Sequence, residues 1–193
     1  MDVGASYRRS VERWAALVAG ASGDWSVPTP CSDWDVRQLV NHVVYEDRWT
    51  KPLMDGKTIA EVGDAFEGDL LGDAPTESAL AAAQEAVGSV QERWPRGGKV
   101  QLSYGEEDLS EYISQLLADH LIHGWDLAAA TGQDRTLDPE LVEVAATWFR
   151  HRQRLYKSIG AVADPPAAAT GGTPQADLLI AFGRDPDWTA GSQ

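Results

Sequence analysis

The sequence has few of the features on which several protein classes depend. It contains a single cysteine, Cys31, which excludes an internal disulfide and a cysteine-rich zinc module. It has no run of about 18 apolar residues, so we expect no membrane-spanning helix. The N-terminal stretch MDVGASYRRSVERW lacks the apolar core of a signal peptide and is typical of a helix. We therefore expect a cytoplasmic protein.

Positive charge is also scarce. The chain has 16 lysine and arginine residues against 30 aspartate and glutamate residues, which gives a formal net charge of −14. Nucleic-acid binding usually requires a basic stripe that neutralises phosphates. The clearest basic cluster, RHRQRLYK at 150–157, is typical of a solvated face near the C-terminus of a helix. We therefore expect no nucleic-acid partner.

Several catalytic sequence motifs are absent as well. The sequence has no phosphate-binding glycine loop, no dinucleotide fingerprint and no Gly-x-Ser-x-Gly elbow. Kinase, NAD-dependent and serine-hydrolase functions therefore have no support.

Helical periodicity dominates the residues that are present. Ser32 and Asp35 resemble a capping box that would start the second helix. Gly132 has the position of a C-terminal cap, and Asp138 followed by Pro139 is typical of a helix start. The apolar spacing predicts helices over the segments 2–20, 34–53, 76–95, 107–131 and 138–158, with a short one near 174–182.

The segments between these helices have the composition of loops. Residues 54–75 are acidic and rich in glycine, which predicts a loop with at most a short helix. Residues 97–110 predict either a short hairpin or an extended link, and residues 163–175 a linker. We expect an all-α fold, with a four-helix bundle domain over residues 1–162. The linker and a short C-terminal helix, in residues 163–193, are expected to pack on it.

Two of the four histidines stand beside an aspartate in the stretch LLADHLIHGWDLAAATG (116–132). On a helical wheel with Asp119 at zero, His123 lies at about 40° and His120 at about 100°, on or beside the apolar face. Burying a carboxylate and imidazoles without partners costs several kcal/mol, so something must compensate. Asp119 and His123 are four residues apart and can reach one point in space, which suits a metal ion.

The second predicted helix offers a third ligand. His42 lies among apolar residues at helical spacing, so its side chain is expected to point into the bundle. Together His42, Asp119 and His123 would leave one coordination position open, which is typical of a catalytic zinc site. The alternative is a set of core residues in which Asp119 bonds one histidine. Spacing decides neither between these alternatives nor between His120 and His123 as the ligand.

Three stretches carry a resemblance to a known family. WSVPTPCSDWDVRQLVNHVV (25–44) and DHLIHGWDLAAATG (119–132) resemble the DinB/YfiT-like superfamily. They resemble more closely the actinobacterial proteins related to the N-terminal domain of mycothiol-dependent maleylpyruvate isomerase. The tail TPQADLLIAFGRDPDW (173–188) resembles the end of the short relatives. The resemblance covers most of the chain. It implies a DinB-like four-helix bundle that holds a divalent metal, usually zinc or nickel, between its helices.

The resemblance also implies which residues are the ligands. The first histidine of the family corresponds to His42, and its carboxylate and second histidine correspond to Asp119 and His123, which disfavours His120. Two departures are visible. The isomerase has glutamate where this chain has Asp119, whose shorter side chain leaves room for a different metal geometry. No sizeable second domain follows the bundle, which argues against the isomerase reaction itself.

The function implied by the resemblance is metal-dependent thiol chemistry. A divalent ion, zinc or else nickel, would activate a thiol, mycothiol by family, for an S-transferase or isomerase reaction. The alternatives are a metal-assisted hydrolase and a non-catalytic bundle that binds a metal or ligand. Two histidines and a carboxylate also occur in non-haem iron oxygenases. The expected partners are a small-molecule thiol and an electrophilic substrate, and a homodimer is the candidate assembly.

Two carboxylates near the predicted ligands are weak candidates for catalysis. Glu46 follows His42 by one helical turn and is either a base at the site or an ordinary solvated residue. Asp126 is either a proton acceptor for a ligand imidazole, which would fix its tautomer, or a solvent-facing residue near the helix end.

The remaining candidates have ordinary explanations too. Trp34, Tyr45 and Trp49 either line a pocket or belong to the core. Cys31 has no neighbouring cation in the sequence to stabilise a thiolate, so we expect a small apolar residue rather than a nucleophile. His151 lies among arginines and is expected to be exposed.

Overall fold

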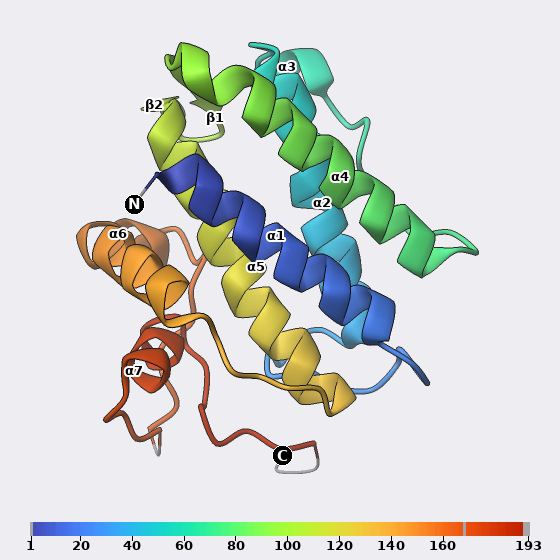
Figure 1. The fold of residues 1–193 in the computed structure, drawn as a ribbon, viewed down its shortest axis with the longest axis vertical. Helices are drawn as coiled ribbons and strands as arrows, with labels where there is room; N and C mark the ends of the chain where they lie inside the picture. Colours follow the sequence, from blue (N-terminus) through green and yellow to red (C-terminus); the bar gives the residue numbers. More distant parts are fainter. Residues whose placement is uncertain (1, 168, 191–193) are drawn as a thin grey trace.

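The computed structural model describes residues 2–167 and 169–190, and it confirms the all-α prediction (Figure 1). The helices are α1 (Val3–Gly20), α2 (Val36–Met54), α3 (Ile59–Val62), α4 (Pro75–Arg93), α5 (Leu109–Thr131), α6 (Pro139–Ser158) and α7 (Pro174–Ala181). A short 3₁₀ turn, η1 (Trp94–Arg96), follows α4, and the strands β1 (Lys99–Leu102) and β2 (Gly105–Asp108) precede α5.

The bundle is formed by α1, α2, α4 and α5. Helix α1 packs against α5 and α4, and α2 packs against the same two helices. The four helices therefore enclose one shared core. Large side chains such as Trp14, Leu39 and Leu117 are fully buried there. Helix α6 lies beside this bundle in contact with α5 and α1, and α7 packs on α6. The arrangement leaves α2 and α5 facing each other, which positions the candidate site.

The start of α2 differs from the prediction. Asp35, rather than Ser32, is the N-cap: its side chain accepts a hydrogen bond from the backbone N–H of Gln38 at 2.8 Å. The Gln38 side chain accepts one from the backbone N–H of Asp35 at 3.0 Å. A reciprocal box needs a long side chain three residues after the cap, which Gln38 provides for Asp35 and which Ser32 lacks. Ser32 instead lies in a turn in which Trp34 N–H donates to the Cys31 carbonyl.

The other element boundaries follow the predictions closely. Gly132 caps α5 in the left-handed region at φ 69°, where glycine is favoured, and Asp138 caps α6 with Pro139 as its first residue. The loop 54–75 contains only the short α3. The segment 97–110 forms the hairpin, with β1 and β2 antiparallel.

Two further predictions concern the chain as a whole. The division into a bundle domain over 1–162 and an extension over 163–193 stays a prediction, although α7 does pack on α6. Within the described residues, none of the helices combines the length and the apolar character needed to cross a membrane.

Candidate metal centre

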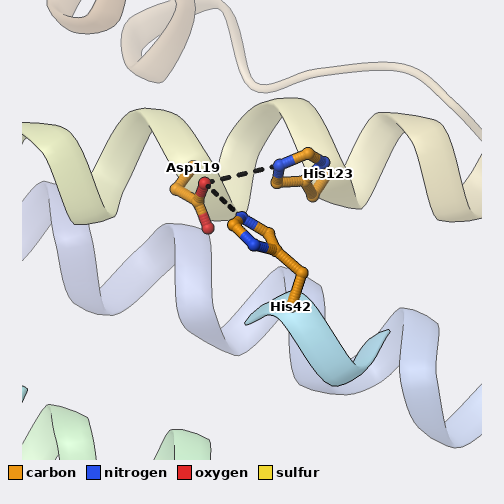
Figure 2. A group of neighbouring side chains, drawn as sticks. All are labelled: His42, Asp119 and His123. Carbon is orange, nitrogen blue, oxygen red and sulfur yellow. Dashed lines mark hydrogen bonds and ion pairs between the residues drawn. The ribbon is translucent and has the colours of Figure 1, made fainter. Parts of the chain in front are cut away.

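The three predicted ligands lie together between α2 and α5 (Figure 2). His42 projects from α2, while Asp119 and His123 project from successive turns of α5. Their potential ligand atoms all lie within 4.8 Å of one another. Nε2 of His42 and Nε2 of His123 are each 3.4 Å from Oδ1 of Asp119. The structure therefore brings together the set of residues that the sequence predicts.

The spacing of these atoms is more typical of metal ligands than of hydrogen-bonded partners. A charge-assisted N–H···O bond is about 2.7–2.9 Å long. Two ligand atoms held tetrahedrally at about 2.0–2.2 Å from one zinc ion are about 3.3–3.6 Å apart. In addition, Oδ2 of Asp119 is buried and has no hydrogen-bond partner among the described residues. The donor set, its spacing and this spare oxygen all fit a divalent cation.

Electrostatics at the site favour positive charge beside Asp119. Burial is the largest influence on both groups and would raise the pKa of Asp119 and lower that of His123. The attraction between the carboxylate and the imidazoles of His42 and His123 outweighs burial. The two imidazoles hold the pKa of Asp119 well below its usual range. Asp119 and Asp126 in turn raise the pKa of His123 to about 9. Without a metal, a proton on His123 supplies the positive charge that the carboxylate requires.

Asp126 holds the other side of the His123 ring. Its Oδ2 lies 3.0 Å from Nδ1 of His123, and the residue is fully buried, so the solvent-facing alternative for Asp126 is wrong. Burial would raise the pKa of Asp126, but the Arg184 guanidinium and His123 lower it overall. A carboxylate at Nδ1 keeps the proton there and presents Nε2 to Asp119, which is how metal-ligating histidines are usually oriented.

Arg184 is the site residue that the sequence reasoning missed. It lies in the segment after α7 and donates to both oxygens of Asp126 at 2.7–3.2 Å. It also donates to the backbone oxygen of Phe182 at 2.9 Å. The one available signal was an arginine directly after the apolar stretch DLLIAFG, where no surface helix continues. Periodicity says nothing about which distant residue such an arginine contacts.

The three ligands open into a cavity of about 480 Å³. Its walls come from α2, α5 and α6 and from the segments 31–34, 160–163 and 182–184. Glu46 lines this cavity and is half-buried, which places it at the site rather than among the solvated residues of the surface. Burial, and next the charge of Asp119, raise the pKa of Glu46 to about 7.

The three aromatic candidates divide between pocket and core. The ring of Trp34 lies over His42, with 4.5 Å between ring centroids, and lines the cavity. Tyr45 lines a second, more open cavity of about 620 Å³ that shares Trp34 and His42 with the first. Trp49 is buried in the hydrophobic core. The pocket interpretation therefore holds for Trp34 and Tyr45, and the core interpretation for Trp49.

His120 is separate from the metal centre. Its Nδ1 lies 2.8 Å from a backbone oxygen one turn earlier in α5, and its Nε2 lies 3.2 Å from Oδ1 of Asp47. Both side chains are completely buried. This geometry agrees with the register that the resemblance implies, in which His123 rather than His120 belongs to the site.

The two remaining candidates have no catalytic features. Cys31 is half-buried at the edge of the cavity, and burial raises the pKa of its thiol, which disfavours the nucleophilic thiolate. His151 is exposed, as predicted.

Comparisons with known proteins place this geometry in context. Residues 7–128 match the model of a family described as the mycothiol maleylpyruvate isomerase N-terminal domain. Two uncharacterized proteins, from two strains of Mycobacterium tuberculosis, are each 32% identical over 146 residues, which cover 73% of this chain and 74% of each relative. No solved structure gives a significant match. The three candidate ligands lie inside the matched range, whereas α6, α7 and Arg184 lie outside it.

Proposed function

Because the chain belongs to the mycothiol maleylpyruvate isomerase N-terminal domain family, we propose that it is a metal-dependent thiol S-transferase or isomerase. His42, Asp119 and His123 would hold one divalent ion, zinc before nickel. The thiol is of low molecular weight, and mycothiol is the first candidate because the family description names it. The second reactant is a small electrophile.

One observation carries this proposal. Three ligand atoms lie within 4.8 Å of one another at the wall of a cavity of about 480 Å³, and a buried carboxylate oxygen beside them has no other described partner. Three protein ligands leave a coordination position open, which distinguishes catalytic from structural zinc sites. The cavity is also large enough for an organic reactant, because ligand sites in proteins usually begin at about 300 Å³.

The chemistry divides between the ion and the chain. When bound, a divalent ion supplies the Lewis acidity that removes the proton of a coordinating thiol. His42 and His123 act as neutral imidazoles, and Asp126 holds the proton of His123 at Nδ1, away from the ligand atom. Glu46 lines the cavity beside the ligands, and its ionised carboxylate would accept the thiol proton. Trp34 covers His42 and limits the access of water.

A second function uses the same residues. With water rather than a thiol as the nucleophile, Glu46 would be the general base of a metal-assisted hydrolase, because it lines the same cavity. The two functions differ in whether turnover requires a thiol.

The test is a conjugation assay on protein purified without a chelator or nickel column. Monochlorobimane is the electrophile, with mycothiol and other physiological thiols tried in turn, with and without a chelator. We expect conjugation that the chelator abolishes, that His42→Ala loses and that the exposed-histidine control His151→Ala retains. Absence of metal-dependent conjugation with every thiol overturns the proposal. Chelator-sensitive hydrolysis that needs no thiol supports the hydrolase instead.

A further inference from the structure

We propose that the cavity beside the candidate ligands accepts an uncharged aromatic electrophile and discriminates against carboxylates. The inference rests on the proposed function for the reaction and the bound ion, and its account of recognition rests on the side chains that line the cavity.

One side of the cavity is an aromatic wall, which we define as Trp148, Tyr156 and Phe182. The rings hold one another in place. Trp148 and Tyr156 meet edge to face with 5.5 Å between centroids, and Phe182 stacks on Phe149 at 3.9 Å. Nε1 of Trp148 donates to Glu111 at 2.9 Å, which fixes the orientation of the indole. A preorganised wall of this kind binds a flat apolar ligand at little entropic cost.

Further rings come from the bundle side of the cavity. Trp34 lines it from the loop before α2, and Tyr112 lines it from α5. Five of the twenty lining residues are therefore aromatic, whereas aromatic residues make up 8% of the chain. An enrichment of this size favours a ligand that is itself flat and apolar, because aromatic rings prefer edge and offset contacts with one another.

The charges around the cavity disfavour the binding of an anionic ligand. Among the described lining residues, Arg184 is the only lysine or arginine, and its guanidinium is already engaged by both oxygens of Asp126 and by a backbone oxygen. The acidic residues Asp33, Glu46 and Asp119 also line the cavity. A carboxylate ligand would lose its hydration and meet these acids without an unpaired basic side chain.

A bound metal does not reverse this balance. The two positive charges of a divalent ion are offset by the carboxylate of Asp119 and by one ionised thiol, so little net charge remains to attract an anion.

The aromatic wall and the candidate ligands come from different parts of the sequence. His42, Asp119 and His123 lie within residues 7–128, the part that matches the family model, whereas Trp148, Tyr156 and Phe182 lie beyond it. The proposed metal chemistry thus belongs to the matched region, and the choice of electrophile to the region that follows it.

Binding of a matched, unreactive pair of probes tests the inference. The probes are methyl 3-phenylpropanoate and 3-phenylpropanoate, which share a ring and differ in charge. Each is titrated calorimetrically into the zinc-loaded protein with 2-mercaptoethanol in excess, which keeps the anion from the open coordination position. We expect the ester to bind at least roughly tenfold more tightly than the anion, because only the anion must be desolvated without a partner. Equal or tighter binding of the anion overturns the inference.

Variants of the wall locate the binding. Tyr156→Ala should weaken ester binding roughly five- to tenfold, because it removes a ring contact, and Tyr156→Phe should restore it. Ile159→Ala is the matched control, since Ile159 is 53% exposed and does not line the cavity. Metal content should be unchanged in all three. Unaltered ester binding in a folded Tyr156→Ala protein overturns the inference.

The same experiments separate this inference from the proposed function. Ester binding at the wall without any metal-dependent conjugation sinks the proposed function and leaves the recognition intact. Metal-dependent conjugation that prefers carboxylated electrophiles supports the proposed function and overturns the inference about recognition.

Discussion

His120 and His123 stand three residues apart on α5, and each faces a carboxylate, but their surroundings are opposite. His120 and Asp47 are both completely buried and form an ion pair at 3.2 Å, and neither the Asp47 oxygens nor Nε2 of His120 makes a hydrogen bond among the described residues. His123 shares Asp119 with His42 at 3.4 Å, and the side chain of Asp119 remains 24% exposed beside the cavity. The first arrangement is sealed away from that cavity, and the second borders it, where a third participant has room.

The difference lies in what encloses each carboxylate. The rings of Tyr7 and Trp14 lie against His120, with centroids 5.6 and 6.2 Å away, and burial raises the pKa of Asp47. Asp119 faces two imidazoles, which together lower its pKa despite burial. One carboxylate shared by two imidazoles at the wall of a cavity is the arrangement on which the proposed cation site rests. A single pair sealed among rings acts as a structural link between α2 and α5.

The largest expected effect concerns metal content. Wild-type protein should carry roughly one divalent ion per chain, because the three ligands form a single site. His42→Ala, Asp119→Ala and His123→Ala should each lose most of it, whereas His120→Ala should retain it. Elemental analysis after purification without chelator or nickel column measures the outcome. Full metal occupancy in His42→Ala, or loss of metal in His120→Ala but not in His123→Ala, would contradict the assignment.

The loss of folding stability should be larger in His120→Ala than in His42→Ala, the reverse of the order expected for metal content. His120→Ala leaves the carboxylate of Asp47 buried without its partner, which typically costs about 3–5 kcal/mol. His42→Ala leaves Asp119 with His123 as a partner and should cost only about 1 kcal/mol in chelated protein, the scale of one hydrogen bond. Urea unfolding of the chelated variants measures both free energies. Equal losses in the two variants would remove the distinction between a structural pair and a ligand set.

Much of this comparison could be predicted from local sequence patterns. Helical spacing places Asp119 and His123 on one face, and it places His42 inward on α2, because both patterns depend on residues within one or two turns. Asp47 carried a usable signal that was overlooked: it lies four and eight residues after the buried Val43 and Leu39, and therefore on the core face of α2. That position predicts a buried partner, and His120 is the one it meets.

Other parts depend on contacts that no local pattern records. Arg184 reaches Asp126 across 58 residues of sequence, and the aromatic wall depends on how α6 and the following segment fold back over the cavity. The error at Ser32 has a local cause, because two overlapping cap patterns compete and the longer side chain of Gln38 decides for Asp35. Choosing His123 over His120 required the family resemblance, since both residues lie near the apolar face.

Asp126 provides a smaller test of the same contrast. Nδ1 of His123 is held by this carboxylate, whereas Nδ1 of His120 is held by the backbone of its own helix. Asp126→Asn should therefore weaken zinc affinity about 10- to 100-fold, as is usual when the residue behind a ligand histidine is changed. Competition with a chromophoric chelator measures the affinity, and Asp187→Asn, at an exposed position in the segment after α7, is the control. Wild-type affinity in Asp126→Asn would show that this contact does not orient the ligand.

The smallest expected effect is on the pH dependence of the melting temperature, and its sign depends on the metal. In chelated protein the pKa of His123 is about 9, above the value of about 6.5 in the unfolded chain. The stability that this shift contributes is fully present below about pH 6.5 and is lost as the pH rises through about 9. Glu46, with its pKa raised to about 7, acts in the same direction at lower pH. The melting temperature of chelated protein should therefore fall by a few degrees between about pH 6 and 9.

Zinc should oppose this trend, because the ion competes with the proton on His123. Ligand imidazoles must be neutral, so zinc affinity rises as the pH approaches 9, and a ligand that binds only the folded state stabilises it by mass action. The gap in melting temperature between zinc-loaded and chelated protein should widen steadily over this range. A fluorimetric grid of pH against zinc and chelator measures it. His42→Ala retains the pair of His123 with Asp119, so it should follow the chelated slope under both conditions. Identical wild-type curves with zinc and with chelator would mean that Asp119 and its histidines are bonded core residues like Asp47 and His120.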